Sequence, residues 1–143
     1  MKLAIDTNAY RLMMDGEARA VRLARTAERL LMPVPVLAEL RYGFLNGKKG
    51  RENEATLARF LDRARVEVLC CDAETAVRYA ELKLQLKRQG TPIPLNDVWI
   101  AASAAETGSV LLTTDHDFDH LNPSPVSVWW LDPDAKSWPT VPP

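Results

Sequence analysis

The sequence lacks most of the features that mark secreted, membrane-bound or disulfide-rich proteins. Only two of its 143 residues are cysteines, the adjacent Cys70 and Cys71, and adjacent cysteines rarely bridge each other, so we expect no disulfide framework. No hydrophobic run approaches the roughly 18 residues of a membrane span, and the start of the chain lacks the apolar stretch of a signal peptide. We therefore expect a cytoplasmic protein without a membrane segment, with both cysteines packed at the buried end of a strand.

Two common phosphate-binding motifs are also absent. Neither the Rossmann glycine fingerprint nor the P-loop occurs, and Gly47-Lys48-Lys49-Gly50 resembles a P-loop only superficially. These absences argue against a nucleotide-binding protein of either type. A phosphatase of the Asp-x-Asp type is excluded because the residue two positions after Asp6 is Asn8.

Short apolar runs alternate along the chain with segments of helical periodicity, which predicts a three-layer α/β fold with a mostly parallel sheet of about five strands. We place a single domain at 1–131 and a proline-rich tail at 132–143. Gly47 to Gly50 reads as the turn of a helical hairpin. The predicted strands are 2–6, 30–33, 66–70, 109–113 and 126–130, and the predicted helices are 8–15, 17–29, 35–46, 51–64, 73–89 and 95–107.

Acidic residues stand where two of the predicted strands end. Asp6 follows one buried apolar run, and Asp115 and Asp117 follow another at 109–113. The ligand crevice of an open α/β sheet lies outside the carboxyl ends of its strands, so we expect these acids to face one crevice.

Two further acids lie in the first turns of predicted helices. Asp97 begins the helical run after Pro94, and Glu39 lies one turn after Pro35. A pocket of like charges is stable only when a cation occupies it, so the four sites together predict a divalent metal centre. Taken singly, each acid could instead cap a helix or form a turn.

The formal net charge is −1, but the charges are unevenly placed. Residues 41–65 carry seven Lys or Arg against three acids, a local excess of four positive charges. A phosphate-binding rim and an ordinary solvated face would both produce this excess. The candidate residues for binding a nucleic-acid backbone in it are Arg41, Lys48, Lys49 and Arg51.

Four short segments containing these acids occur at separate places along the chain. They are Ile5-Asp6-Thr7-Asn8, Pro35 to Gly43, Leu95-Asn96-Asp97 with Ile100-Ala101-Ala102, and Leu112 to Phe118. In this order and spacing the chain resembles PIN-domain proteins, and within them the VapC toxins of type II toxin-antitoxin systems. The resemblance implies a PIN-like α/β/α fold, a ribonuclease dependent on Mg²⁺ or Mn²⁺, a VapB-like antitoxin partner and a homodimer, and it makes Asp6, Glu39, Asp97 and Asp115 the acidic quartet.

Residue chemistry suggests how these side chains divide the work. Carboxylates are hard ligands suited to Mg²⁺ or Mn²⁺, and we expect Asp6, Asp97 and Asp115 to bind the ion. Glu39 is the candidate for orienting or deprotonating the attacking water. Five residues are candidate auxiliaries: Thr7, Asn8, Asn96, Thr113 and Asp117. His116 and His120 have the spacing of a zinc pair, but we expect them to be exposed or hydrogen-bonded.

Two alternative functions remain open from the sequence. A PIN nuclease of housekeeping RNA processing or decay would share the same pocket. A receiver-like signalling module would also hold Mg²⁺ in an acidic pocket, but it needs an acceptor Asp after the third strand and a Lys after the fifth. The third predicted strand ends Cys70-Cys71-Asp72, and no Lys follows the last one until Lys136.

Overall fold

The computed structural model of the protein describes residues 1–121 and 126–130. The predicted tail at 132–143 and the side chains of Trp129 and Trp130 lie outside the described residues. The described part begins with a strand and alternates strands with pairs of helices, as the sequence predicts.

A five-stranded sheet forms the centre of the molecule, in the order β3-β2-β1-β4-β5. All four neighbouring pairs are parallel, which confirms the predicted sheet. β1 and β4 are its most deeply buried strands, and Leu3, Ile5 and Leu112 are fully buried. The strands are β1 (Lys2–Ile5), β2 (Arg29–Pro33), β3 (Val66–Leu69), β4 (Val110–Thr113) and β5 (Ser127–Trp130).

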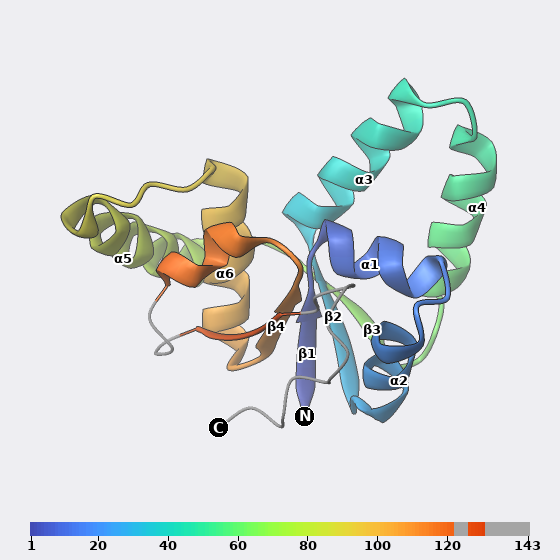
Figure 1. Cartoon of the computed structure of the whole chain (residues 1–143), viewed down its shortest axis with the longest axis horizontal. Coiled ribbons are helices and arrows are strands. Elements are labelled where there is room, and N and C mark those ends of the chain that lie inside the picture. The colour runs from blue at the N-terminus through green and yellow to red at the C-terminus, as the bar shows by residue number, and fades with distance from the viewer. Residues whose placement is uncertain (122–125, 131–143) are drawn as a thin grey trace.

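Six α-helices of the described residues flank the sheet. In Figure 1, α1 to α4 lie on one side of the picture and α5 and α6 on the other. Parallel crossovers are almost always right-handed, so reversing the direction of progress after β3 places α5 and α6 on the opposite face from the earlier helices. The helices are α1 (Thr7–Met14), α2 (Ala18–Thr26), α3 (Val34–Asn46), α4 (Gly50–Leu61), α5 (Ala73–Gln89) and α6 (Leu95–Thr107).

Local sequence signals account for where these helices begin and end. Asp72 and Thr75 form a capping box at the start of α5, which ends at Gly90 with a φ of 69°. Proline in the first turn begins α3. The segment after β4, which the sequence reads as a turn, forms the short 3₁₀ helix η1 (His116–His120), and Phe118 anchors it in the core.

The prediction for the cysteines is wrong, because both Cys70 and Cys71 are exposed. β3 is an edge strand, and its first and last residues, Val66 and Leu69, are only partly buried. The chain leaves β3 into solvent before α5 begins at Ala73.

The helix at 73–89 is confirmed. The apolar residues whose helical spacing predicts it are Ala76, Val77, Ala80 and Leu84, and they do not face the core. Val77 and Leu84 are 49% and 45% exposed, whereas Thr75, Leu82 and Leu86 are buried. The side of α5 that packs on α6 is therefore not the side with the most regular apolar spacing.

Candidate active site

The topology gathers the predicted acids at one edge of the sheet. Strand order reverses between β1 and β4, and the crevice at such a reversal is where α/β sheets bind ligands. Asp6 follows β1 directly, and Asp115 lies two residues beyond β4. α3 packs against α6, and this contact brings Glu39 beside the first turn of α6, which carries Asp97.

Three carboxylates converge most closely. Oxygens of Asp97, Asp115 and Asp117 all lie within 4.8 Å of one another, and each of the three residues is half-buried. Asp117, which we predicted only as an auxiliary residue, is therefore a full member of the cluster. The signal for it was present in the Asp-x-Asp pattern after β4, since a tight turn there can direct both acids to one point.

Asp6 is the most buried of the acids, at 4% exposed. One of its oxygens accepts a hydrogen bond from the backbone N–H of Ala9 at 2.8 Å, which makes it the N-cap of α1, and the other accepts from the hydroxyl of Thr113. Burial raises its pKa to about 6, and the charges of Asp115 and Glu39 act in the same direction. Asp6 is thus both a cap and a member of the acidic pocket, although its oxygens are outside the closest group of three.

Asp97 is repelled by the negative charges of all the other acids in the pocket. Its pKa is raised to about 7, chiefly by burial and then by the negative charges of Asp115, Glu39, Asp117 and Asp6. Four acids from three other segments therefore act on one carboxyl group. This electrostatic cost is what a bound cation would remove.

Glu39 is held by hydrogen bonds at both carboxylate oxygens. The amide of Asn96 donates to one oxygen at 2.7 Å, and the hydroxyl of Thr7 donates to the other. These donors come from α6 and α1, so the position of Glu39 is fixed from two sides. Asn8, in contrast, is exposed and makes no side-chain hydrogen bond within the described residues.

Thr113 links two of the acids. Its hydroxyl donates to Asp6 and accepts from the backbone N–H of Asp115 at 2.9 Å. The carboxylate of Asp115 in turn accepts from the backbone N–H of Asp117 at 2.8 Å and so caps η1. The strand end, the cap and the acidic cluster therefore form one connected network.

The two histidines do not join this network as metal ligands in the described structure. Both are exposed, and Nδ1 of His116 lies 3.0 Å from a carboxylate oxygen of Asp119. The expectation of exposed or hydrogen-bonded histidines is confirmed.

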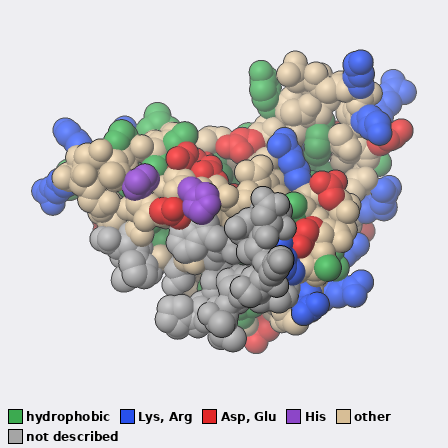
Figure 2. All heavy atoms as spheres, in the orientation of Figure 1, with side chains coloured by type: hydrophobic (Ala, Val, Ile, Leu, Met, Phe, Trp, Pro, Cys, Tyr) green, Lys and Arg blue, Asp and Glu red, His purple; other side chains and the backbone are tan. Residues whose placement is uncertain are grey.

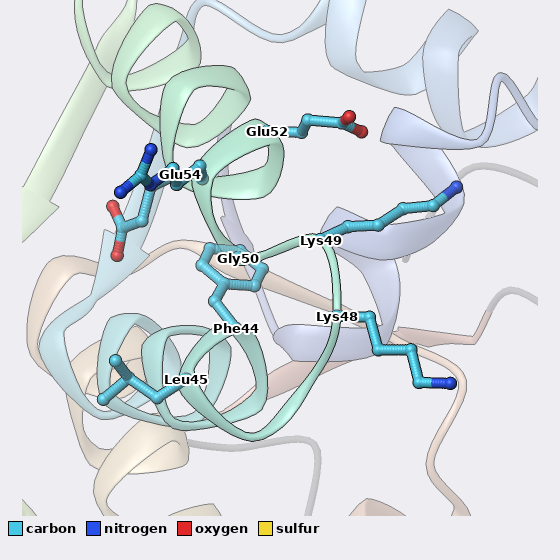
Figure 3. Close-up of a pocket in the computed structure, with 8 residues that line it drawn as sticks. Phe44, Leu45, Lys48, Lys49, Gly50, Glu52 and Glu54 are labelled. Atoms are coloured by element: carbon cyan, nitrogen blue, oxygen red, sulfur yellow. The ribbon is translucent and has the colours of Figure 1, made fainter.

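The structure separates the predicted basic residues from the acids. Lys48, Lys49 and Arg51 surround an open cavity of about 690 Å³ at the α3–α4 turn, and Figure 3 shows Lys48 and Lys49 extending to the same side of that turn. Arg41 is paired with Glu54, with Nε 3.2 Å from the carboxylate oxygen. In Figure 2, Lys and Arg side chains gather at the outer end of the α3–α4 pair, while acids lie in the hollow between this end and α6.

Comparison with known proteins gives this arrangement a family. The PIN domain family matches residues 3–122, and the chain belongs to it. Ribonuclease VapC5 of Mycobacterium tuberculosis is 32% identical over 118 residues, which cover 82% of this chain and 86% of that protein. The tRNA(fMet)-specific endonuclease VapC of Salmonella typhimurium is 26% identical over 90% of this chain and 98% of its own length.

Solved structures agree. VapBC2 of Rickettsia felis, bound to a DNA fragment from its promoter, matches with a TM-score of 0.79 and 26% identity over 92% of this chain and all of that one. The VapBC-5 toxin-antitoxin system of M. tuberculosis matches with a TM-score of 0.70 and 30% identity over 91% and 98% of the two chains. Within the PIN-domain family, the chain belongs to the VapC ribonucleases, which removes the receiver alternative.

Proposed function

We propose that this protein hydrolyses RNA phosphodiester bonds with a Mg²⁺ or Mn²⁺ ion held by its acidic pocket, and that it acts as the toxin of a toxin-antitoxin pair. The observation that carries the proposal is the convergence of Asp97, Asp115 and Asp117, whose carboxylate oxygens lie within 4.8 Å of one another. Carboxylate oxygens are ligands suited to Mg²⁺ and Mn²⁺, and these three residues would hold the ion.

Asp6 remains part of the proposed metal site. Each of its oxygens accepts one hydrogen bond and keeps a second lone pair. Asp6 is buried and caps α1, and it also accepts a hydrogen bond from the hydroxyl of Thr113. The same hydroxyl accepts from the backbone N–H of Asp115, so Asp6 is linked to Asp115 through Thr113. A divalent ion would supply a more acidic water and neutralise charge developing on the phosphoryl oxygens.

Glu39 is proposed to orient the attacking water and to accept its proton. The hydrogen bonds from Thr7 and Asn96 fix both of its oxygens, so the carboxylate needs no reorganisation during the reaction. Asn96 and Thr7 are therefore positioning residues, which act through Glu39.

The basic turn is proposed to bind the RNA backbone at a distance from the cut. Lys48, Lys49 and Arg51 lie around the α3–α4 turn, beyond the end of α3 that is farther from Glu39. Arg41 lies on α3, between Glu39 and this turn. Contacts of this kind supply affinity without reading sequence.

We further propose a VapB-like antitoxin as partner, because several structural neighbours are VapBC complexes. An enzyme that degrades cellular RNA needs a protein that blocks it, and a cytoplasmic location is part of the proposal. Within the described residues no helix is long and apolar enough to cross a membrane. The homodimer remains a prediction, which light scattering of the purified protein would test.

The experiment that tests this function combines cleavage with growth. Purified protein is incubated with total RNA in Mg²⁺ or Mn²⁺, and the cut sites are mapped. We expect cleavage that EDTA abolishes, and induced expression that arrests growth unless Asp97→Asn is present. Metal-dependent cleavage with no growth arrest would favour a housekeeping nuclease instead, and cleavage unaffected by EDTA would refute the proposed chemistry.

A further inference from the structure

A second cavity, of about 340 Å³, lies at the corner where α5 leads into α6. Its wall is apolar except for two lysines, and one of its side chains, Leu95, is 55% exposed. None of these residues belongs to the acidic pocket. The cavity is lined by Lys83, Leu86, Lys87, Pro92, Ile93, Leu95 and Val98.

This corner pocket is physically tied to the acidic site. Leu95 is the first residue of α6, directly before Asn96 and Asp97. On the other side, the amide of Gln89 donates a 2.8 Å hydrogen bond to the backbone carbonyl of His120, which is the last residue of η1. The connection that forms the pocket is therefore attached at both ends to elements that carry metal-site acids.

The charge around the corner pocket suits an anionic ligand. In the part of the chain described, neither Lys83 nor Lys87 pairs with a carboxylate, and Nζ of Lys83 lies 5.8 Å from the centre of the Tyr79 ring. Figure 2 shows hydrophobic side chains around the α5–α6 end, between the basic side chains at its tip and the acids in the hollow. A strand crossing this surface would meet positive charge, an apolar surface and the acidic pocket in turn.

We propose that the corner pocket binds one unstacked base of the RNA substrate, while Lys83 and Lys87 contact the neighbouring phosphates. This inference rests on the proposed function. Proteins that select single-stranded RNA hold bases that have left the stack in apolar or aromatic pockets and bind the backbone with cations. The pocket would then set which nucleotide beside the cut is accepted, a choice that the distant basic turn cannot make.

The same apolar surface could in principle meet a second copy of the chain. In a symmetric pair each surface contacts the same surface of its partner, so Lys83 and Lys87 of both copies would lie in one interface, where their positive charges repel. An RNA strand meets no such opposition. The lysines therefore favour RNA, and the two occupants give different experimental outcomes.

The test uses two pocket variants, each with a matched control. Leu95→Ala removes part of the apolar wall, and Leu84→Ala removes a similarly exposed leucine of α5 that does not line the pocket. Lys87→Glu reverses one charge of the rim, and Lys2→Glu reverses one charge at the start of β1, at the end of the sheet opposite the acids. Cleavage kinetics are measured on single-stranded RNA of mixed sequence, and light scattering reports the oligomeric state of each variant.

We expect each pocket variant to raise KM about tenfold, as the loss of one base contact does, with a smaller effect on kcat and none from the controls. Single-stranded RNA containing 4-thiouridine should cross-link within residues 92–98 on irradiation, and duplex RNA should not compete. Unchanged KM without a cross-link would overturn the pocket, as would a change in oligomeric state caused by Leu95→Ala at constant KM. If the wild-type protein cleaves no RNA, the proposed function fails, but the cross-link still decides whether the pocket holds a base.

Discussion

Asp97 experiences the strongest repulsion in the site, because it is half-buried and four carboxylates from three other segments act on it. Asp97→Asn keeps the size of the side chain and removes its charge, so we expect the cleavage rate to fall by about 100-fold or more. The control is Asp119→Asn, an exposed acid on η1 outside the close group of three. Equal rates for both variants and the wild type would make Asp97 a structural residue of α6.

The raised pKa values predict how the metal-free protein responds to pH. The pKa of Asp97 is 3.8 in the unfolded chain and about 7 in the folded one. The folded state therefore binds more protons, and this contribution to stability is present below about pH 4 and lost as the pH rises through about 7.

In EDTA, Asp97→Asn should therefore unfold at a higher temperature than the wild type, and the difference should grow from pH 5 to pH 8. Asp6→Asn should behave similarly over a window ending near pH 6, and asparagine can still cap α1. Thermal unfolding at each pH measures the difference. A difference that stays constant with pH would show that these carboxyl groups titrate normally.

Hydrogen bonds distinguish two asparagines that the sequence could not separate. Asn96 holds Glu39 at 2.7 Å, whereas Asn8 is exposed. We expect Asn96→Ala to lower kcat by about tenfold and Asn8→Ala to leave it unchanged. Asn96→Asp, which would put a second carboxylate against Glu39, should be worse than Asn96→Ala. Equal effects of the two alanine variants would contradict a positioning role.

At the residue scale, the sequence could identify acids but not their partners. Asp6, Asp97 and Asp115 stand beside apolar runs or helix starts, and those local patterns are visible in one dimension. The bonds from Thr7 and Asn96 to Glu39 depend on α3 meeting α1 and α6 in space. No spacing in the sequence encodes that meeting.

The strands were predictable because short apolar runs mark them, and predicted and observed strands differ by at most one residue at either end. The predicted helices 17–29 and 51–64 run three residues beyond the observed ends at Thr26 and Leu61. The burial of Cys70 and Cys71 was mispredicted for a non-local reason, because only the strand order makes β3 an edge strand.

The α3–α4 turn depends on Gly50, the glycine at its end and the first residue of α4. A Cβ on Gly50 would lie 2.7 Å from the backbone oxygen of Phe44, whereas a Cβ on Gly43 would meet only the end of the Arg11 side chain, at 3.4 Å. Gly50→Ala should therefore lower the melting temperature by several degrees. Gly43→Ala should raise it slightly, because alanine stabilises a helix interior by about 0.5–1 kcal/mol relative to glycine. Similar shifts for both would mean that the turn relaxes freely.

On the scale of the whole molecule, the net charge of −1 is a sum over separate acidic and basic regions. Acids lie in the hollow, and basic side chains lie at the outer end of α3–α4 and at the tip of the α5–α6 end. The excess of positive charge in residues 41–65 was visible in the sequence. That the α3–α4 turn places Lys48, Lys49 and Arg51 away from the acids was not. The fold produces this separation, because α3 starts at the acidic edge of the sheet and runs outward from it.

We propose that the acidic hollow is a divalent-metal site built from four segments of the chain. Calorimetric titration of the metal-free protein with Mn²⁺ measures this binding. We expect saturable binding that Asp97→Asn weakens strongly and Asp119→Asn leaves unchanged. Absence of saturable binding, or equal affinity of the wild type and Asp97→Asn, would contradict it.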